Sequence, residues 1–163
     1  MTTDILEHDR LYTRDYKGTI GFGDLPETVL INIFKDGRFA TEFISRDLES
    51  YFSNLSYVDK TWYDFITPEG VQVEQKQLTI ASGFKFCPSH MIGKGRKVDR
   101  SVVETYIKDN DLQYLVVSTI NFPIIHIRMI PGVRLLELFP QSGCGSEAKN
   151  IYDLMDMPNA IKP

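Results

Sequence analysis

The sequence TPEGV, which begins at Thr67, constrains the fold of this chain more than any other feature. Pro68 has the fixed φ that the second position of a type I turn requires, and Gly70 suits the left-handed conformation that follows such a turn. A type I turn followed by a left-handed glycine forms a three-residue β-hairpin loop with a bulge. The sequence therefore predicts a hairpin in which Thr67 pairs with Val71.

Counting back along this hairpin predicts which side chains share a face of the sheet. Ile66 is expected opposite Gln72, and Asp64 opposite Glu74. Residues that lie directly opposite one another point to the same face, with roughly 5 Å between Cβ atoms. Lys76 lies two residues beyond Glu74 and points to that face too, about 7 Å further along the strand. Two carboxylates and one amine are thus predicted to lie together.

Carboxylates placed side by side repel each other unless a cation lies between them. Lys76 supplies part of the compensation, and a divalent metal such as Mg²⁺ would supply more, because it prefers carboxylate oxygens, a carbonyl and waters. The lysine would then orient or deprotonate a water, or stabilise the charge of a phosphorane. The three residues therefore suit phosphodiester hydrolysis. The alternatives are a solvated strand face, and a pair in which Asp59 replaces Asp64.

Two stretches have the period of an amphipathic helix. Residues 37–55 place apolar side chains on one half of the helical wheel and charged ones on the other. Residues 99–110 form the second predicted helix, capped near Asp99 or Ser101. The apolar residues 28–34 fit either a buried strand or a short helix.

The remaining apolar stretches are predicted strands: residues 61–66, 71–80, 112–120, 122–130 and 133–139. Residues 1–27 are polar and irregular, and the chain from Gln141 onwards is expected to be a loop that can end in a helical turn. Helices that alternate with strands in this order predict one α/β or α+β domain around a single sheet. The core is expected to span residues 28–140.

Composition and charge limit the class of protein. With 163 residues, 42% of them hydrophobic and 25% charged, the chain suits one globular domain. Its two cysteines have no CxxC spacing, which argues against a disulfide scaffold or a four-cysteine zinc site. No signal peptide and no apolar run of about 18 residues is found, so we expect a soluble, cytoplasmic protein. The net charge is −4.

One segment of this acidic chain is locally basic: SGFKFCPSHMIGKGRKVDR, residues 82–100, carries five Lys or Arg residues against Asp99 alone. Its glycines allow close approach of the backbone to a ligand, and its cations suit phosphates. Candidate DNA-binding side chains in this segment are Lys85, Ser89, His90, Lys94, Arg96 and Lys97. Several of these can read base edges. The alternative is a flexible, solvated loop.

The pattern D-x9-E-x-K, which follows a helix and spans a hairpin with E-x-K on the second strand, resembles the PD-(D/E)xK nuclease superfamily. The spacing D-x5-G-x3-E-x-K, then GF and later HM, is similar to that of a small dimeric restriction enzyme that cuts a six-base palindrome. The resemblance covers residues 38–140 as architecture and 64–94 as motif. Tyr63 stands where the family name expects proline.

The resemblance implies a site and a cofactor. Asp64 and Glu74 would bind Mg²⁺, or Mn²⁺ in its place, with the backbone carbonyl of Gln75 as a further ligand. Lys76 would act on the attacking water. Glu42, on the preceding helix, is a further candidate metal ligand; the alternative is that it lies in solvent, paired with Arg46.

The function that the resemblance implies is Mg²⁺-dependent, sequence-specific cleavage of double-stranded DNA by a restriction or homing endonuclease with a restriction-endonuclease-like core. We expect a homodimer, because two strands must be cut at a symmetric sequence, in the cytoplasm of a bacterial or phage-infected cell. The alternatives are a structure-selective nuclease such as a Holliday-junction resolvase, a non-catalytic DNA- or protein-binding module with this fold, and a plain acidic domain.

Trp62 is expected in the core, with a contact to substrate as the alternative.

Overall fold

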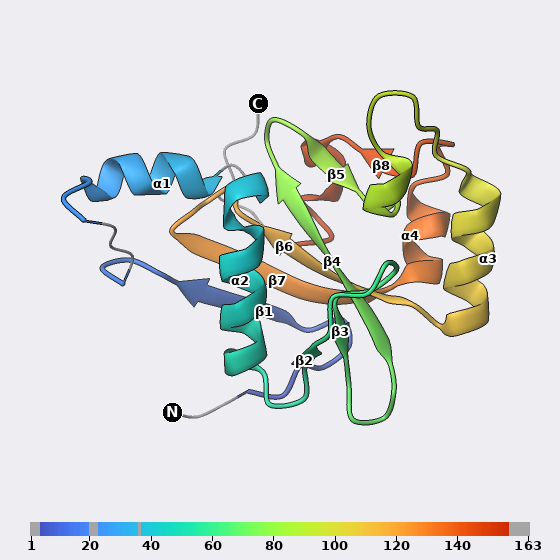
Figure 1. The fold of residues 1–163 in the computed structure, drawn as a ribbon, viewed down its shortest axis with the longest axis horizontal. Helices are drawn as coiled ribbons and strands as arrows, with labels where there is room; N and C mark the ends of the chain where they lie inside the picture. Colours follow the sequence, from blue (N-terminus) through green and yellow to red (C-terminus); the bar gives the residue numbers. More distant parts are fainter. Residues whose placement is uncertain (1–3, 20–22, 36, 157–163) are drawn as a thin grey trace.

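The structure is a computed structural model that describes residues 4–19, 23–35 and 37–156. One mixed sheet organises the chain, with the strand order β1-β7-β6-β4-β3-β2 and with β5 and β8 attached to β4 in turn (Figure 1). Its strands are β1 (Leu11–Asp15), β2 (Ser56–Tyr57), β3 (Phe65–Ile66), β4 (Gln72–Thr79), β5 (Gly83–Lys85), β6 (Gln113–Ser118), β7 (Ile124–Pro131) and β8 (Gly145–Ser146). Among the strands of the described residues, β4 and β6 pair in parallel and the other pairs are antiparallel.

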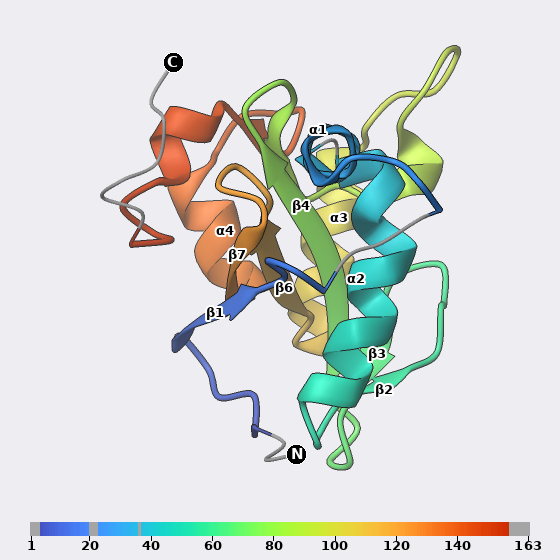
Figure 2. The same cartoon turned by 90° about the vertical axis from the view of Figure 1, so that its left-hand side faces the viewer.

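Helices cover both faces of this sheet, as Figures 1 and 2 show. They are α1 (Glu27–Lys35), α2 (Gly37–Tyr51), α3 (Arg100–Asn110) and α4 (Gly132–Leu138), with the 3-10 turns η1 (Ser89–Met91) and η2 (Ala148–Ile151). α2 packs on one face in a core that includes Ile44 and Leu48. α3 and α4 pack on the other face in a second core that includes Ile107 and Leu135. The predicted α/β class is therefore confirmed as a mixed sheet flanked by helices.

Alternation along β4 decides which helices its polar residues face. Val73 belongs to the core under α2, whereas Leu78 belongs to the core under α3 and α4. Because successive side chains of a strand point to opposite faces, Glu74 and Lys76 share the face of Leu78. The side chain of Gln75 points the other way, where its Oε1 accepts a 3.1 Å hydrogen bond from Ser45 Oγ of α2.

Several predicted elements are confirmed. The helix predicted over 37–55 is α2, and the helix predicted over 99–110 is α3. Asp99 is the N-cap of α3, since its carboxylate accepts hydrogen bonds from the backbone N–H groups of Ser101 and Val102. The ambiguous stretch 28–34 lies in a helix, α1.

Two predictions at the ends of the core are wrong, and they share one cause. Residues 133–139 form the helix α4 instead of a strand, and the N-terminal segment, predicted to be irregular, contributes β1. β1 pairs with β7 on the side away from β6. Both edges of β7 are therefore occupied, so the chain that leaves β7 has no adjacent edge with which to pair. It turns at Gly132, whose N–H donates to Leu112 O at 2.9 Å, and buries Leu135 against α3.

None of the helices in the described ranges has the length and apolar character that crossing a membrane requires.

Candidate active site

The hairpin loop has the predicted geometry. Gly70 N donates to Thr67 O at 2.9 Å, Thr67 N donates to Val71 O at 3.0 Å, and Gly70 has a φ of 85°. The pairing of Thr67 with Val71 is therefore confirmed, and so is the pairing of Ile66 with Gln72. The turn chemistry predicted from the sequence thus sets the register of β3 on β4.

One residue further along, the structure departs from the counted register. Phe65 pairs with Val73, yet Asp64 N also donates to Val73 O, at 3.0 Å. Two consecutive residues thus face one residue of β4, which is the arrangement of a β-bulge. The prediction that the backbone of Asp64 lies opposite Glu74 is wrong, because a bulge shifts the pairing by one residue.

The bulge directs the Asp64 side chain onto the edge of β4. Asp64 Oδ2 accepts a 2.9 Å hydrogen bond from Gln75 N. In a continuous sheet, a backbone carbonyl of the neighbouring strand would accept this hydrogen bond. The chain then leaves the sheet at Trp62, so the predicted strand 61–66 is reduced to its last two residues. Bulges are frequent next to active sites, where they redirect a side chain.

The three predicted catalytic side chains do come together. The carboxyl groups of Asp64 and Glu74 are close enough that each affects the pKa of the other. Glu74 Oε1 lies 2.7 Å from Lys76 Nζ. The side chains of this ion pair are only 11% and 14% exposed, so the charges interact with little screening by water.

Burial dominates the ionisation of both acids. It raises the pKa of Asp64, while the Gln75 N–H and the charge of Lys76 act in the opposite direction. Burial also raises the pKa of Glu74, to about 7; Lys76 lowers it and Asp64 raises it. The two buried carboxylates therefore have too little positive charge near them, and one lysine does not fully compensate them.

A cavity of about 350 Å³ opens beside the two acids. It is lined by Asp59, Lys60, Thr61, Asp64, Glu74, Ser89 and His90. Ser89 and His90 were predicted to bind DNA, and η1 brings both to the rim of this cavity. The catalytic candidates and part of the basic segment therefore meet at one place, although they are distant in the sequence.

Sequence reasoning missed Lys60 and Thr61 and gave Asp59 only as a substitute for Asp64. A closed loop brings them to the cavity: Val58 N and Asp59 N both donate to Asp64 O, at 2.7 and 3.2 Å. Asp59 has a φ of 47°, in the left-handed region that Asp tolerates better than most residues. The sequence carries no periodic signal for such a loop.

Glu42 does not join the other candidates. It lies on α2, which packs against the opposite face of the sheet, and its side chain is 70% exposed. Glu42 Oε1 accepts a 3.1 Å hydrogen bond from Arg46 Nε, and Oε2 lies 3.4 Å from the hydroxyl of Tyr57. The structure thus agrees with the alternative, a solvent-facing Glu42 paired with Arg46.

The other predicted DNA-binding residues lie further along the basic segment. Lys85 and Arg96 line a second hollow of about 350 Å³, which also contains Cys87 and Met91. Lys94 and Lys97 are exposed on the loop between η1 and α3, which extends away from the sheet in Figure 2. The six predicted residues are therefore divided between two hollows and an exposed loop.

Trp62 does not lie where the sequence placed it. It is partly exposed and belongs to neither hydrophobic core. Its ring stacks on Tyr106, with centroids 4.1 Å apart and an interplanar angle of 7°. His90 meets it edge-on at 5.3 Å and 77°. The prediction of a core tryptophan is therefore wrong.

The donor set beside the cavity suits a hard divalent cation. The N–H and C=O of a strand residue point to the same side, so the Gln75 carbonyl faces the edge of β4 on which Asp64 lies. Two carboxylates and one carbonyl are ligands that Mg²⁺ prefers. Within the described ranges, no group of three or more His, Cys, Asp or Glu side chains is arranged to hold a metal ion.

Comparisons with protein-family models, curated proteins and solved structures give no match to this chain.

Proposed function

We propose that the protein is a Mg²⁺-dependent endonuclease that hydrolyses phosphodiester bonds in double-stranded DNA at a specific sequence. One observation carries the proposal: the bulged hairpin brings Asp64 and Glu74 together, with Lys76 on the same face, beside an open cavity. Two carboxylates and a lysine at such a position suit phosphodiester hydrolysis.

The metal would be held by the carboxylates of Asp64 and Glu74 and by the Gln75 carbonyl. The raised pKa values of both acids support this assignment, because they indicate buried carboxylates that lack positive charge. When bound, Mg²⁺ would polarise the phosphoryl group and make a coordinated water more acidic. Glu42 is left out of the proposed ligand set, since it is paired with Arg46 on the other side of the sheet.

The other roles belong to this chain's own groups. Gln75 N–H fixes the orientation of the Asp64 carboxylate, and Glu74 holds the Lys76 ammonium. Lys76 orients the attacking water and stabilises the negative charge that develops on the phosphoryl oxygens. Ser89 and His90, at the rim of the same cavity, contact the DNA next to the cleaved bond.

The arrangement of elements supports a restriction-endonuclease-like core. α2 precedes the β3–β4 hairpin, E-x-K lies on the second strand, and α3 connects β4 to the parallel strand β6. The exposed cations Lys94 and Lys97 would contact phosphates, which position a protein on the duplex. One site of this kind cuts one strand, so cleavage of both strands calls for a homodimer.

A cleavage assay tests this function. Purified protein is incubated with supercoiled and linear phage DNA, with and without Mg²⁺. Discrete fragments are expected only with Mg²⁺, and Glu74→Ala and Lys76→Ala should abolish them. Glu69→Ala is the matched control, because Glu69 is an exposed acid in the turn of the same hairpin. Cleavage by Lys76→Ala at the wild-type rate would refute the assignment.

A further inference from the structure

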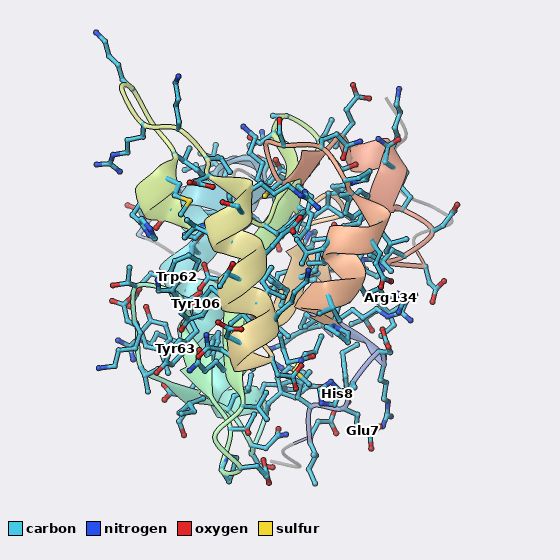
Figure 3. All side chains as sticks on the ribbon, turned by 90° about the vertical axis from the view of Figure 1, so that its right-hand side faces the viewer. Glu7, His8, Trp62, Tyr63, Tyr106 and Arg134 are labelled. Atoms are coloured by element: carbon cyan, nitrogen blue, oxygen red, sulfur yellow. The ribbon has the colours of Figure 1, made fainter. Side chains whose placement is uncertain are left out.

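Trp62 is the single tryptophan of the chain and is not used by either hydrophobic core. Large aromatic side chains usually contribute to stability by burying 150–250 Å² each. Partial exposure of the Trp62 ring gives up part of that contribution. Figure 3 shows Trp62 and Tyr106 next to each other, on the side of α3 away from α4. The position of this ring therefore calls for another explanation.

The ring is held firmly in place. Tyr106 stacks parallel to Trp62, and the Tyr106 hydroxyl donates a 2.7 Å hydrogen bond to Gln72 Oε1. Gln72 is the first residue of β4, the strand that carries Glu74 and Lys76. His90 meets the indole from a second direction. The aromatic stack is thus fixed to the strand that carries the proposed catalytic residues.

A shallow groove of about 300 Å³ lies against the two stacked rings. It is lined by Trp62, Ser101, Val102, Thr105, Tyr106, Asp109 and Asn110. Asp109 is the one charged residue in this lining, and it is negative, so the groove disfavours phosphate. Aromatic rings, hydroxyls and an amide instead suit an uncharged, planar ligand with hydrogen-bonding edges, which describes a nucleobase.

The groove lies next to the proposed catalytic cavity. Thr61, the residue before Trp62, lines that cavity, and so does His90, which contacts the Trp62 ring. Trp62 therefore separates the place for a phosphodiester from the place for a base. A strand that crosses this boundary would present its phosphate to Asp64 and Glu74 and its base to the aromatic rings.

We propose that the groove at Trp62 and Tyr106 binds an unpaired base of the DNA strand, next to the bond that is cut. This inference rests on the proposed nuclease function and narrows its substrate. A base inside a duplex has both faces covered by its neighbours, so it must be unpaired or turned out of the helix to stack on a side chain. The substrate is therefore DNA in which the base next to the cleaved bond is unpaired or is turned out of the duplex when the protein binds its site.

The single tryptophan allows a direct test by fluorescence. The Lys76→Ala protein, in EDTA to prevent cleavage, is titrated with three oligonucleotides of equal length: a continuous duplex, a duplex with one unpaired nucleotide, and the same DNA with an abasic site at that position. Strong quenching of Trp62 emission is expected with the unpaired base alone. Equal quenching by all three would overturn the inference.

Substitution supplies the second measurement. Trp62→Ala should weaken binding of the DNA with the unpaired base by about 5- to 150-fold, the range for stacking of one base on an aromatic ring, and leave binding of the abasic DNA unchanged. Phe43→Ala is the aromatic control, because Phe43 is also partly exposed but lies on α2. A thermal melt checks that each variant is folded, and Trp62→Phe should recover part of the affinity.

The outcomes separate this inference from the nuclease assignment. Mg²⁺-dependent cleavage by the wild-type protein, together with an equal loss of affinity for all three DNAs in Trp62→Ala, would overturn only the base-stacking role. Absence of both cleavage and DNA binding in the wild-type protein would overturn both proposals.

Discussion

Replacement of Glu74 by glutamine should remove a pH dependence of stability that the buried site creates. Burial raises the pKa of Glu74 in the folded protein from 4.5 to about 7. As the pH rises from 4.5 to 7, Glu74 ionises first in the unfolded chain, and in the folded protein it ionises only near pH 7. The free energy of unfolding therefore falls as the pH rises from 4.5 to 7 and is constant above that range.

The size of this fall follows from the two pKa values. Each tenfold change in an ionisation constant corresponds to about 1.36 kcal/mol, so the difference between 4.5 and 7 corresponds to roughly 3 kcal/mol. Relative to Glu74→Gln, the wild-type protein should thus lose roughly 3 kcal/mol between about pH 4 and about pH 8. The amide also leaves Lys76 without its partner, but that cost is the same at both ends of the window.

Urea unfolding in EDTA, followed by far-ultraviolet circular dichroism at several pH values, measures the difference directly. Glu69→Gln, which alters an exposed acid in the same hairpin, should follow the wild-type curve. Mg²⁺ at about pH 8 should restore stability to the wild-type protein and not to Glu74→Gln, because a ligand that binds only the folded state stabilises it. Parallel pH profiles for wild type and Glu74→Gln would refute the reasoning that burial controls this site.

Three further predictions concern the hairpin, the helix cap and the basic loop. Gly70→Ala should lower stability by about 1 kcal/mol, measured by urea unfolding, because its φ of 85° is unfavourable for alanine although nothing lies within 4 Å of an added Cβ. Asp99→Ala should cost about 1 kcal/mol in the same assay, whereas Asp99→Asn should retain most of the cap. Combined replacement of Lys94, Arg96 and Lys97 by alanine should reduce the slope of log K against log salt for DNA binding by about 2 to 3; an unchanged slope would place the DNA elsewhere.

Local signals in the sequence predicted those parts of the fold that short-range interactions determine. Gly70 and Pro68 set the hairpin loop, and a helical period together with the Asp99 cap set α3. The shared face of Glu74 and Lys76 also followed from the sequence, because strand alternation fixes which side chains share a face. The approach of Asp64 to them was predicted from a register that the bulge changes.

Long-range packing decided the rest. β1 takes the place beside β7, which leaves residues 133–139 to form a helix, and α2 lies on the face that keeps Glu42 away from Glu74. These outcomes depend on which elements pair with a sheet edge and which pack on each face of the sheet. No local sequence pattern predicts either choice.

The site itself divides in the same way. Its charged groups follow from the amino-acid sequence: two acids and a lysine of fixed spacing around one hairpin turn. The tertiary structure alone determined the bulge at Asp64, the burial that raises the pKa of Glu74, and the meeting of His90 and Trp62 beside the cavity. The physical reason is that spacing and turn geometry act through covalently linked neighbours, whereas desolvation and contacts across the cavity exist only after distant segments have packed together.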